Sequence, residues 1–272
     1  MLNRFPLHTR ILLVLLALLP IYFLIAAFGT RIGIFGWKFG LLTMTLGGGV
    51  ILLGLLALVA LVSLVITLRA KPRRGGLLAV AILGLLLPLG AGALFAAAGA
   101  KGAANPIHDI STDTANPPAF SEGTMAAREA AGANPLADYQ TPLGQIPFWQ
   151  DKGLSPELAV KSHAQIITDR ADRPAPLPLG GASKAEGVAA VAAAMGQMGL
   201  GDIRSDPETG MVEGVATTFW FGFRDDVVAR VGETQIDFRS VSRVGASDLG
   251  ANTARILELR EKTQGLLGAA SR

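Results

Sequence analysis

No aspartate or glutamate occurs before Asp109, although residues 1–108 contain nine lysines and arginines. The formal net charge of +3 therefore averages two unlike regions, because residues 109–272 contain 15 basic and 21 acidic residues. This pattern predicts a membrane anchor over residues 1–104 and a water-soluble domain over residues 105–272. Because the basic residues flank apolar stretches, we expect the lipid bilayer as a partner and exclude nucleic acid.

Three uncharged intervals are long enough to cross a bilayer, whose hydrocarbon core of about 30 Å requires about 20 helical residues. They cover residues 11–30, 39–68 and 75–100. The second interval is longer than one crossing needs and contains three consecutive glycines, so we expect its helix to begin late, near residue 42, or to tilt. The intervals contain no Asp, Glu, Lys, Arg or His, which favours an anchor or an assembly surface over a transporter.

The basic loops decide the expected orientation, because Lys and Arg in short loops stay on the cytoplasmic side. The loop RAKPRR at 69–74 contains four basic residues, whereas the loop between the first two intervals contains only Arg31 and Lys38. We therefore expect a multi-pass protein of the inner (plasma) membrane with a cytoplasmic N-terminus and a periplasmic or otherwise extracytoplasmic C-terminal domain. A cleaved signal peptide over the first interval is the alternative, although 20 apolar residues exceed the usual length of about 7 to 15. Both alternatives leave the domain on the same face.

The C-terminal region has the pattern of an α+β domain with two layers, in which two helices pack on a mainly antiparallel sheet. Residues 105–178 are rich in turn residues, with one short helix expected in SPELAVKSHAQII. A helix is expected over 183–198, with Ser183 and Glu186 as a capping box and Gly199 as its stop. Two hairpins follow over 201–223 and 225–244, and a last helix over 247–267 begins at Ser247 and has Leu249 on its apolar side.

Chemical signatures are sparse in this sequence. The chain has no cysteine, so disulfides, thiol catalysis and thiolate metal sites are excluded together. It also lacks the GxSxG, HExxH, P-loop and haem-attachment patterns. We therefore expect no cofactor and no metal.

The second hairpin contains the first candidate site. Side-chain alternation places Asp237, Arg239 and Arg243 on one face of the strand and Ser240 and Ser242 on the other. One interpretation is an anion-binding patch formed by the two arginines. The other is a solvated sheet face with cross-strand ion pairs, each contributing about 0.2 to 1 kcal/mol.

Two more arginines extend that candidate site. Arg230 is expected opposite Asp237 if Glu233 and Thr234 form the hairpin tip. Arg255 is expected to reach the patch from the last helix. Both arginines therefore belong to the candidate ligand-binding set.

The loop IHDISTDT is the second candidate site. His108, Asp109 and Asp113 have side chains that serve as metal ligands or as an acid and base pair. Their spacing matches no metal motif. The alternative is a loop whose Asp and Thr side chains bond to their own backbone.

Three segments occurring in order carry a family resemblance: NPIHDISTDTANPPAF, EGVATTFWFGFRDDVVARV and DFRSVSRVGASDLGANTARI. They resemble the domain-of-unknown-function family 1499, and the likeness covers most of residues 102–265, outside the three apolar intervals. The resemblance implies an uncharacterised bacterial and plastid-type domain without an established reaction. It also implies special interest in the residues that match the family motifs: His108, Asp109, Thr112, Asp113, Phe223, Asp225, Asp226, Arg230, Asp237, Arg239, Ser240, Ser242, Arg243, Asp248, Asn252 and Arg255. Residues 126–173 diverge from the family pattern.

Two classes of function are compatible with these features. The first is a noncatalytic, membrane-tethered domain that binds a membrane or envelope protein partner or a small anionic ligand. The second is a membrane-anchored hydrolase in which His108 or Asp113 acts as a base and Arg239 or Arg243 holds a negative substrate.

Overall fold

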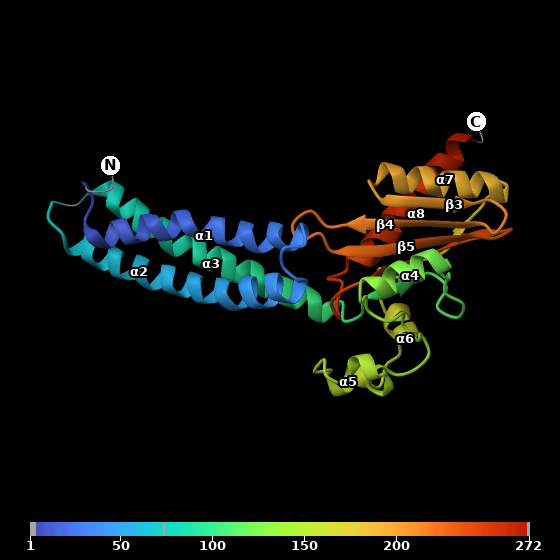
Figure 1. The fold of residues 1–272 in the computed structure, drawn as a ribbon, viewed down its shortest axis with the longest axis horizontal. Coiled ribbons are helices and arrows are strands. Elements are labelled where there is room, and N and C mark those ends of the chain that lie inside the picture. Colours follow the sequence, from blue (N-terminus) through green and yellow to red (C-terminus); the bar gives the residue numbers. More distant parts are fainter. Residues whose placement is uncertain (1–3, 73, 271–272) are drawn as a thin grey trace. The chain divides into compact units, whose positions relative to one another are not determined.

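The structure of this protein is a computed structural model that describes residues 4–72 and 74–270. Arg73, one of the four basic residues of the loop RAKPRR, lies outside the described residues. The chain divides into two compact units, which consist of Met1–Ala100 with Phe219–Gly222 and of Lys101–Thr218 with Phe223–Arg272. Figure 1 colours the elements of both units along the sequence.

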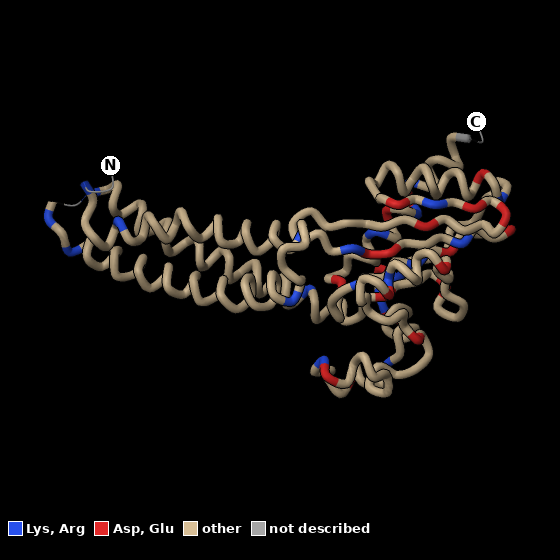
Figure 2. The backbone as a smooth tube through the Cα atoms, viewed as in Figure 1, with Lys and Arg blue, Asp and Glu red and all other residues tan. Residues whose placement is uncertain are grey.

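The first unit contains the three expected long apolar helices. They are α1 (Leu7–Arg31), the segment Lys38–Arg69 and α3 (Gly75–Ala104), and each is long and apolar enough to cross a membrane. Figure 2 shows that acidic residues are absent from these helices and that basic residues lie near their ends. The chain therefore has three candidate membrane spans, which is consistent with a membrane protein. Pro20 and Pro88 lie inside α1 and α3, so both helices continue past their prolines.

The second apolar segment differs from the expected start near residue 42. It begins at Lys38 as a π-helix, η2 (Lys38–Gly48), and continues as the α-helix α2 (Gly49–Arg69). The Thr45 hydroxyl donates to the Gly40 carbonyl at 2.8 Å. Gly40 also permits close packing on α1, because a Cβ there would lie 1.7 Å from the Thr30 hydroxyl oxygen. The glycines therefore allow the segment to begin as a wide π-helix that packs closely on α1, instead of delaying the helix.

The second unit is built on an antiparallel sheet. The strand order is β1-β6-β5-β4-β3, with β2 also pairing with β6. The strands are β1 (Asp109–Ser111), β2 (Leu177–Pro178), β3 (Gly201–Asp206), β4 (Met211–Thr217), β5 (Arg224–Val231) and β6 (Gln235–Ser242). Both predicted hairpins are confirmed, and Arg230 lies opposite Asp237 as the expected hairpin tip requires.

Two helices cover one face of this sheet and enclose the main core. Helix α7 (Lys184–Gln197) packs on β3, β4 and β5, while α8 (Ala251–Ala270) packs on β6 and β1 (Figure 1). The Ser183 and Glu186 capping box is formed as predicted. Gly199 follows α7 with φ of 72°, the left-handed conformation that ends helices. The predicted α+β class, with an antiparallel sheet and two packing helices, is confirmed.

The last helix starts later than the sequence predicted. Residues 247–250 form turns, in which the Ser247 hydroxyl accepts from the Leu249 amide and the Asp248 carboxylate accepts from the Gly250 and Asn252 amides. Leu249 has φ of 54° and is 43% exposed, so its predicted place on the apolar side is wrong. The side chains of Ser247 and Asp248 bond to amides within this turn, and Asp248 also accepts from Asn252 in the first turn of α8, so the helix begins after the turn and not at Ser247.

The segment before the sheet contains more helix than expected. Two short helices replace the single helix predicted near Ser155. They are α5 (Pro156–Ala159) and α6 (His163–Thr168), and they are separate because Ser162 forms a capping box that starts α6. Helix α4 (Glu122–Ala130), capped by Ser121, was not predicted. Its only buried residues are Thr124 and Arg128, so it lacks the apolar periodicity that identifies most helices.

Along β6, the second face of the sheet is covered rather than solvated. Asp237, Arg239 and Arg243 are 4%, 5% and 7% exposed, although they lie on the face predicted to be polar. Helix α4 and the loop around it contribute Phe120 and Arg128, which pack against these charges. The interpretation of a solvated sheet face is therefore wrong, because the segment over 113–139 folds onto it.

Candidate functional site

Arg239 is held by the first acidic residue of the chain. Its Nε and Nη2 donate to the two carboxylate oxygens of Asp109 at 3.0 and 2.7 Å. The Tyr139 hydroxyl and the Ala137 amide also donate to this carboxylate at 2.6 and 2.9 Å. The guanidinium lies over the rings of Phe120 and Tyr139. The pair is therefore a bidentate, fully bonded ion pair inside the domain.

The ionisation of this pair follows from its surroundings. Burial alone would raise the pKa of Asp109, but the charge and hydrogen bonds of Arg239 lower it below the ordinary value of 3.8. Burial and the neighbouring Asp109 raise the pKa of Tyr139 well above 10.0. Asp109 therefore stays ionised and Tyr139 stays protonated at neutral pH.

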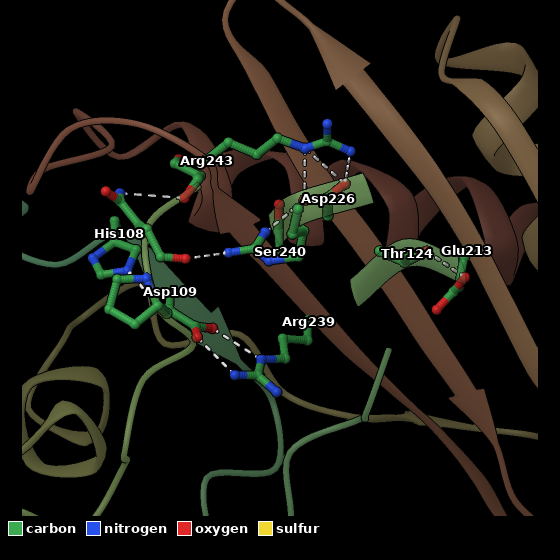
Figure 3. A network of polar contacts seen from close by, with 12 residues as sticks. His108, Asp109, Thr124, Glu213, Asp226, Arg239, Ser240 and Arg243 are labelled. Carbon is green, nitrogen blue, oxygen red and sulfur yellow. Dashed lines mark hydrogen bonds and ion pairs between the residues drawn. The ribbon is translucent and has the colours of Figure 1, made fainter. Parts of the chain in front are cut away.

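A second buried carboxylate binds two arginines. Asp226 on β5 accepts from Arg243 at 2.6 to 3.2 Å and from Arg128 of α4 at 2.5 Å. The Asn134 amide donates to the Arg243 carbonyl at 2.7 Å, and Arg128 donates to the Asn134 carbonyl. Figure 3 shows Arg239 and Arg243 pointing at separate carboxylates. These contacts hold α4 and the following loop on the sheet.

A third group joins the hairpin to the first loop. Arg230 donates to Asp113 at 2.9 Å and to Asp237 at 3.2 Å. Asp113 also accepts from the Ala115 and Asn116 amides. The loop carboxylate therefore bonds both to the sheet and to its own backbone.

The helix-covered face of β6 carries a separate polar cluster. The Ser240 hydroxyl donates to the Asn252 side-chain Oδ1 at 2.7 Å, and the Asn252 side-chain Nδ2 donates to the Ser242 hydroxyl at 3.0 Å. Arg255 donates to Ser240 at 2.8 Å and to Asp225 at 2.7 Å. Because Ser240 and Arg239 alternate along the strand, Arg255 lies across the sheet from Arg239 and Arg243. The three arginines of the expected patch are therefore not brought together.

His108 and His163 form a buried pair of imidazoles beside aromatic rings. Their ring centroids lie 6.2 Å apart, and Tyr139 and Trp149 lie next to His163. The His108 Nε2 lies 3.1 Å from the Pro135 carbonyl, while its Nδ1 and both nitrogens of His163 have no hydrogen-bond partner among the described residues. Burial lowers the pKa of His108, and it lowers the pKa of His163 to about 4. Both rings are therefore neutral at pH 7.

An accessible cleft lies beside α4, over strands β3 to β5. We call it the arginine cleft, and its lining residues are Thr124, Ala127, Asp202, Ile203, Arg204, Val215, Arg224 and Arg243. Its volume is about 330 Å³, which lies within the range of small-molecule sites, about 300 to 1,000 Å³. The side chains of Arg204 and Arg224 are 54% and 50% exposed. Three arginines therefore line one concave surface.

Each arginine of the cleft also contacts a carboxylate of the protein. Arg204 lies 3.3 Å from Glu213 and Arg224 lies 3.2 Å from Asp202, while Arg243 binds the buried Asp226. Exposed ion pairs such as Arg224–Asp202 contribute only about 0 to 1 kcal/mol, so Arg224 can exchange its partner for a ligand at small cost. Glu213 is buried, but it also accepts from Ser121 and from the Thr124 hydroxyl, so it keeps hydrogen-bond partners when Arg204 turns to a ligand. Arg243 is fixed in position by Asp226.

The sequence analysis identified only part of this arrangement. Of the candidate site residues, Arg243 lines the arginine cleft, and the others lie in the groups described above, of which the Asp113 and Arg230 pair is partly exposed. It did not single out Arg204, Arg224 or Thr124. A signal for Thr124 was present in the SEGT segment, where Ser121 caps α4, but nothing local indicated that α4 lies beside β3.

Comparisons with known proteins identify the family. A family model described as "Protein of unknown function (DUF1499)" matches residues 109–263. The chain belongs to the DUF1499 family. No curated protein and no solved structure matches the chain. The match begins at Asp109 and ends within α8, so the DUF1499 domain contains the whole sheet, and the resemblance given by the three sequence segments is confirmed.

Proposed function

We propose that this DUF1499 protein is a noncatalytic binding protein anchored in the inner (plasma) membrane, and that its extracytoplasmic domain takes a small anionic ligand in the arginine cleft. The convergence of Arg204, Arg224 and Arg243 on one cleft carries the proposal. Guanidinium groups bind carboxylate and phosphate oxygens with paired hydrogen bonds. The two half-exposed arginines supply mobile donors, and Arg243 supplies a fixed positive charge.

The burial of His108, Asp109 and Arg239 supports a noncatalytic role, while Asp113, the other candidate base, is partly exposed but is held in an ion pair with Arg230. A general base must come within hydrogen-bond reach of its substrate. His108 is 1% exposed and Asp109 is fully buried. Arg239, the expected anion clamp of a hydrolase, already binds Asp109 through two hydrogen bonds. These groups stabilise the domain and leave anion binding to the arginine cleft.

The basic residues of the anchor support the proposed orientation. With the N-terminus and the RAKPRR loop in the cytoplasm, six basic residues lie inside and three outside. Lys and Arg within short loops favour this arrangement. The domain that follows α3 then lies outside the cytoplasm.

Anion binding to the full chain in lipid nanodiscs tests the proposal. Inorganic phosphate and succinate would be added at constant ionic strength, with chloride as the balancing anion, while domain unfolding is followed. A bound anion stabilises the folded state, by about 2.7 kcal/mol at a concentration 100 times its Kd. Because one hydrogen bond to a charged group contributes about 1.5 to 3 kcal/mol, Arg204→Gln or Arg224→Gln should each weaken binding by about tenfold or more.

Arg173→Gln is the matched control, because Arg173 is exposed and lies outside the arginine cleft. It removes the same charge and should leave the affinity unchanged. The proposal fails if neither anion stabilises the domain. It also fails if the control variant weakens binding as much as the two cleft variants do.

A further inference from the structure

The loop between β4 and β5 exposes two adjacent aromatic side chains. We call residues 218–223, TFWFGF, the aromatic loop. Phe219 is 64% and Trp220 is 55% exposed. Their rings contact edge to face with centroids 5.1 Å apart. They therefore present one continuous apolar surface rather than two isolated side chains.

The loop is closed by its own hydrogen bonds. The Thr218 amide donates to the Phe223 carbonyl at 2.8 Å, and the Phe223 amide donates to the Thr218 hydroxyl at 2.9 Å. Gly222 takes a φ of 68° inside the turn. A loop closed in this way holds the two rings at its tip in the free protein. Their exposure is thus a built feature of the hairpin.

The exposed pair has no equivalent among the described residues that follow α3. The other large apolar side chains exposed there are Met125, Val160, Leu249 and Leu257, none of them aromatic and none adjacent to another. Single exposed apolar residues are normal on soluble surfaces, whereas a joined aromatic pair indicates a binding surface. Residues Phe219–Gly222 also group with the three apolar helices rather than with the strands that flank them.

We infer that the aromatic loop inserts Phe219 and Trp220 into the interfacial layer of the same bilayer that anchors the chain. Tryptophan and other aromatic rings favour the boundary between headgroups and acyl chains. The aromatic loop itself contains no Asp, Glu, Lys or Arg. The charge that contacts it is Arg31, which lies over the Phe219 ring and donates to the Phe219 carbonyl, and arginine is tolerated at the interface, where its charged end reaches water. The DUF1499 domain then has a second attachment to lipid, separate from the arginine cleft.

Site-directed spin labelling tests this second attachment, and the absence of cysteine makes single labels straightforward. Nitroxides at Phe219→Cys and Trp220→Cys would be compared with one at Val160→Cys. Val160 is 70% exposed, and it lies at the end of α5, remote in sequence from the aromatic loop. The full chain would be reconstituted in nanodiscs of phosphatidylcholine and phosphatidylglycerol. Collisions with oxygen report contact with lipid, and collisions with a water-soluble nickel chelate report contact with water.

The loop labels should collide preferentially with oxygen and be shielded from nickel, while the Val160 label should show the reverse. Equal nickel access at the loop and at Val160 would overturn the inference. Shielding from both reagents would overturn it too, because a protein surface would then cover the loop. Circular dichroism of each labelled protein verifies that its domain is folded. None of these outcomes depends on anion binding.

Discussion

His163 should make the stability of the DUF1499 domain fall as the pH drops from 7.5 to 5. The ring is fully buried, and burial lowers its pKa from the ordinary value of 6.5 to about 4. In the unfolded chain the same ring takes up a proton near pH 6.5. Between these two values the unfolded state binds more protons than the folded state, so the free energy of unfolding decreases as the pH falls. Below about pH 4 both states are protonated and the effect ends.

The expected magnitude follows from the two pKa values. A shift of one unit corresponds to about 1.36 kcal/mol. Between pH 7.5 and 5, the proton uptake of His163 in the unfolded state should lower the free energy of unfolding by about 2 kcal/mol. Asp248, whose pKa is raised by burial, acts in the opposite direction at lower pH, since protonation of its folded form stabilises the domain. Measurements should therefore stop at pH 5.

The perturbation is His163→Leu, which removes the titrating group and keeps an apolar side chain of similar size. Denaturant unfolding would be followed in detergent through Trp149, whose ring centroid lies 5.9 Å from that of His163. Trp37 and Trp220 would be replaced by Phe, so that Trp149 is the only fluorescent tryptophan. Compared with the unmutated histidine, the leucine variant should lose about 2 kcal/mol less stability between pH 7.5 and 5.

Tyr139→Phe is the matched control for this experiment. Tyr139 also contacts His163, but its hydroxyl stays protonated throughout the range. This variant should shift the stability by a constant amount at every pH. Parallel pH profiles for the His163→Leu protein and its parent would refute the reasoning, because they would show that His163 binds no more protons when unfolded.

Three further predictions concern the buried charges, a helix cap and the topology. Asp226→Asn leaves Arg128 and Arg243 without their shared carboxylate and should destabilise the domain by about 3 to 5 kcal/mol in denaturant unfolding, whereas Asp226→Glu should restore part of the loss. Ser183→Ala removes the capping box of α7 and should cost about 1 kcal/mol in the same assay, and a loss near zero would contradict a role for the cap. A reporter active only outside the cytoplasm, fused after Arg272, should be active, and an inactive fusion would reverse the proposed orientation.

Local patterns were sufficient where one segment determines its own structure. Alternation along β6 placed Asp237 and Arg239 on one face and Ser240 on the other, and the hairpin tip fixed Arg230 opposite Asp237. The capping box at Ser183 likewise needs only four consecutive residues. Helix α4 escaped detection because the residues it buries are polar and gain their partners only from the sheet.

The sequence by itself determined that the first part of the chain forms three helices long and apolar enough to cross a membrane, because its apolar runs are uninterrupted by acidic residues. It also determined the family, through the segments around Asp109 and β6. Only the tertiary structure decided what the charges do. Asp109 and Arg239 are 130 residues apart in the chain, and no local pattern can show that one neutralises the other. The same long-range folding buried the expected anion patch and exposed the cleft formed by Arg204 and Arg224, because burial and charge pairing depend on which segments meet in space.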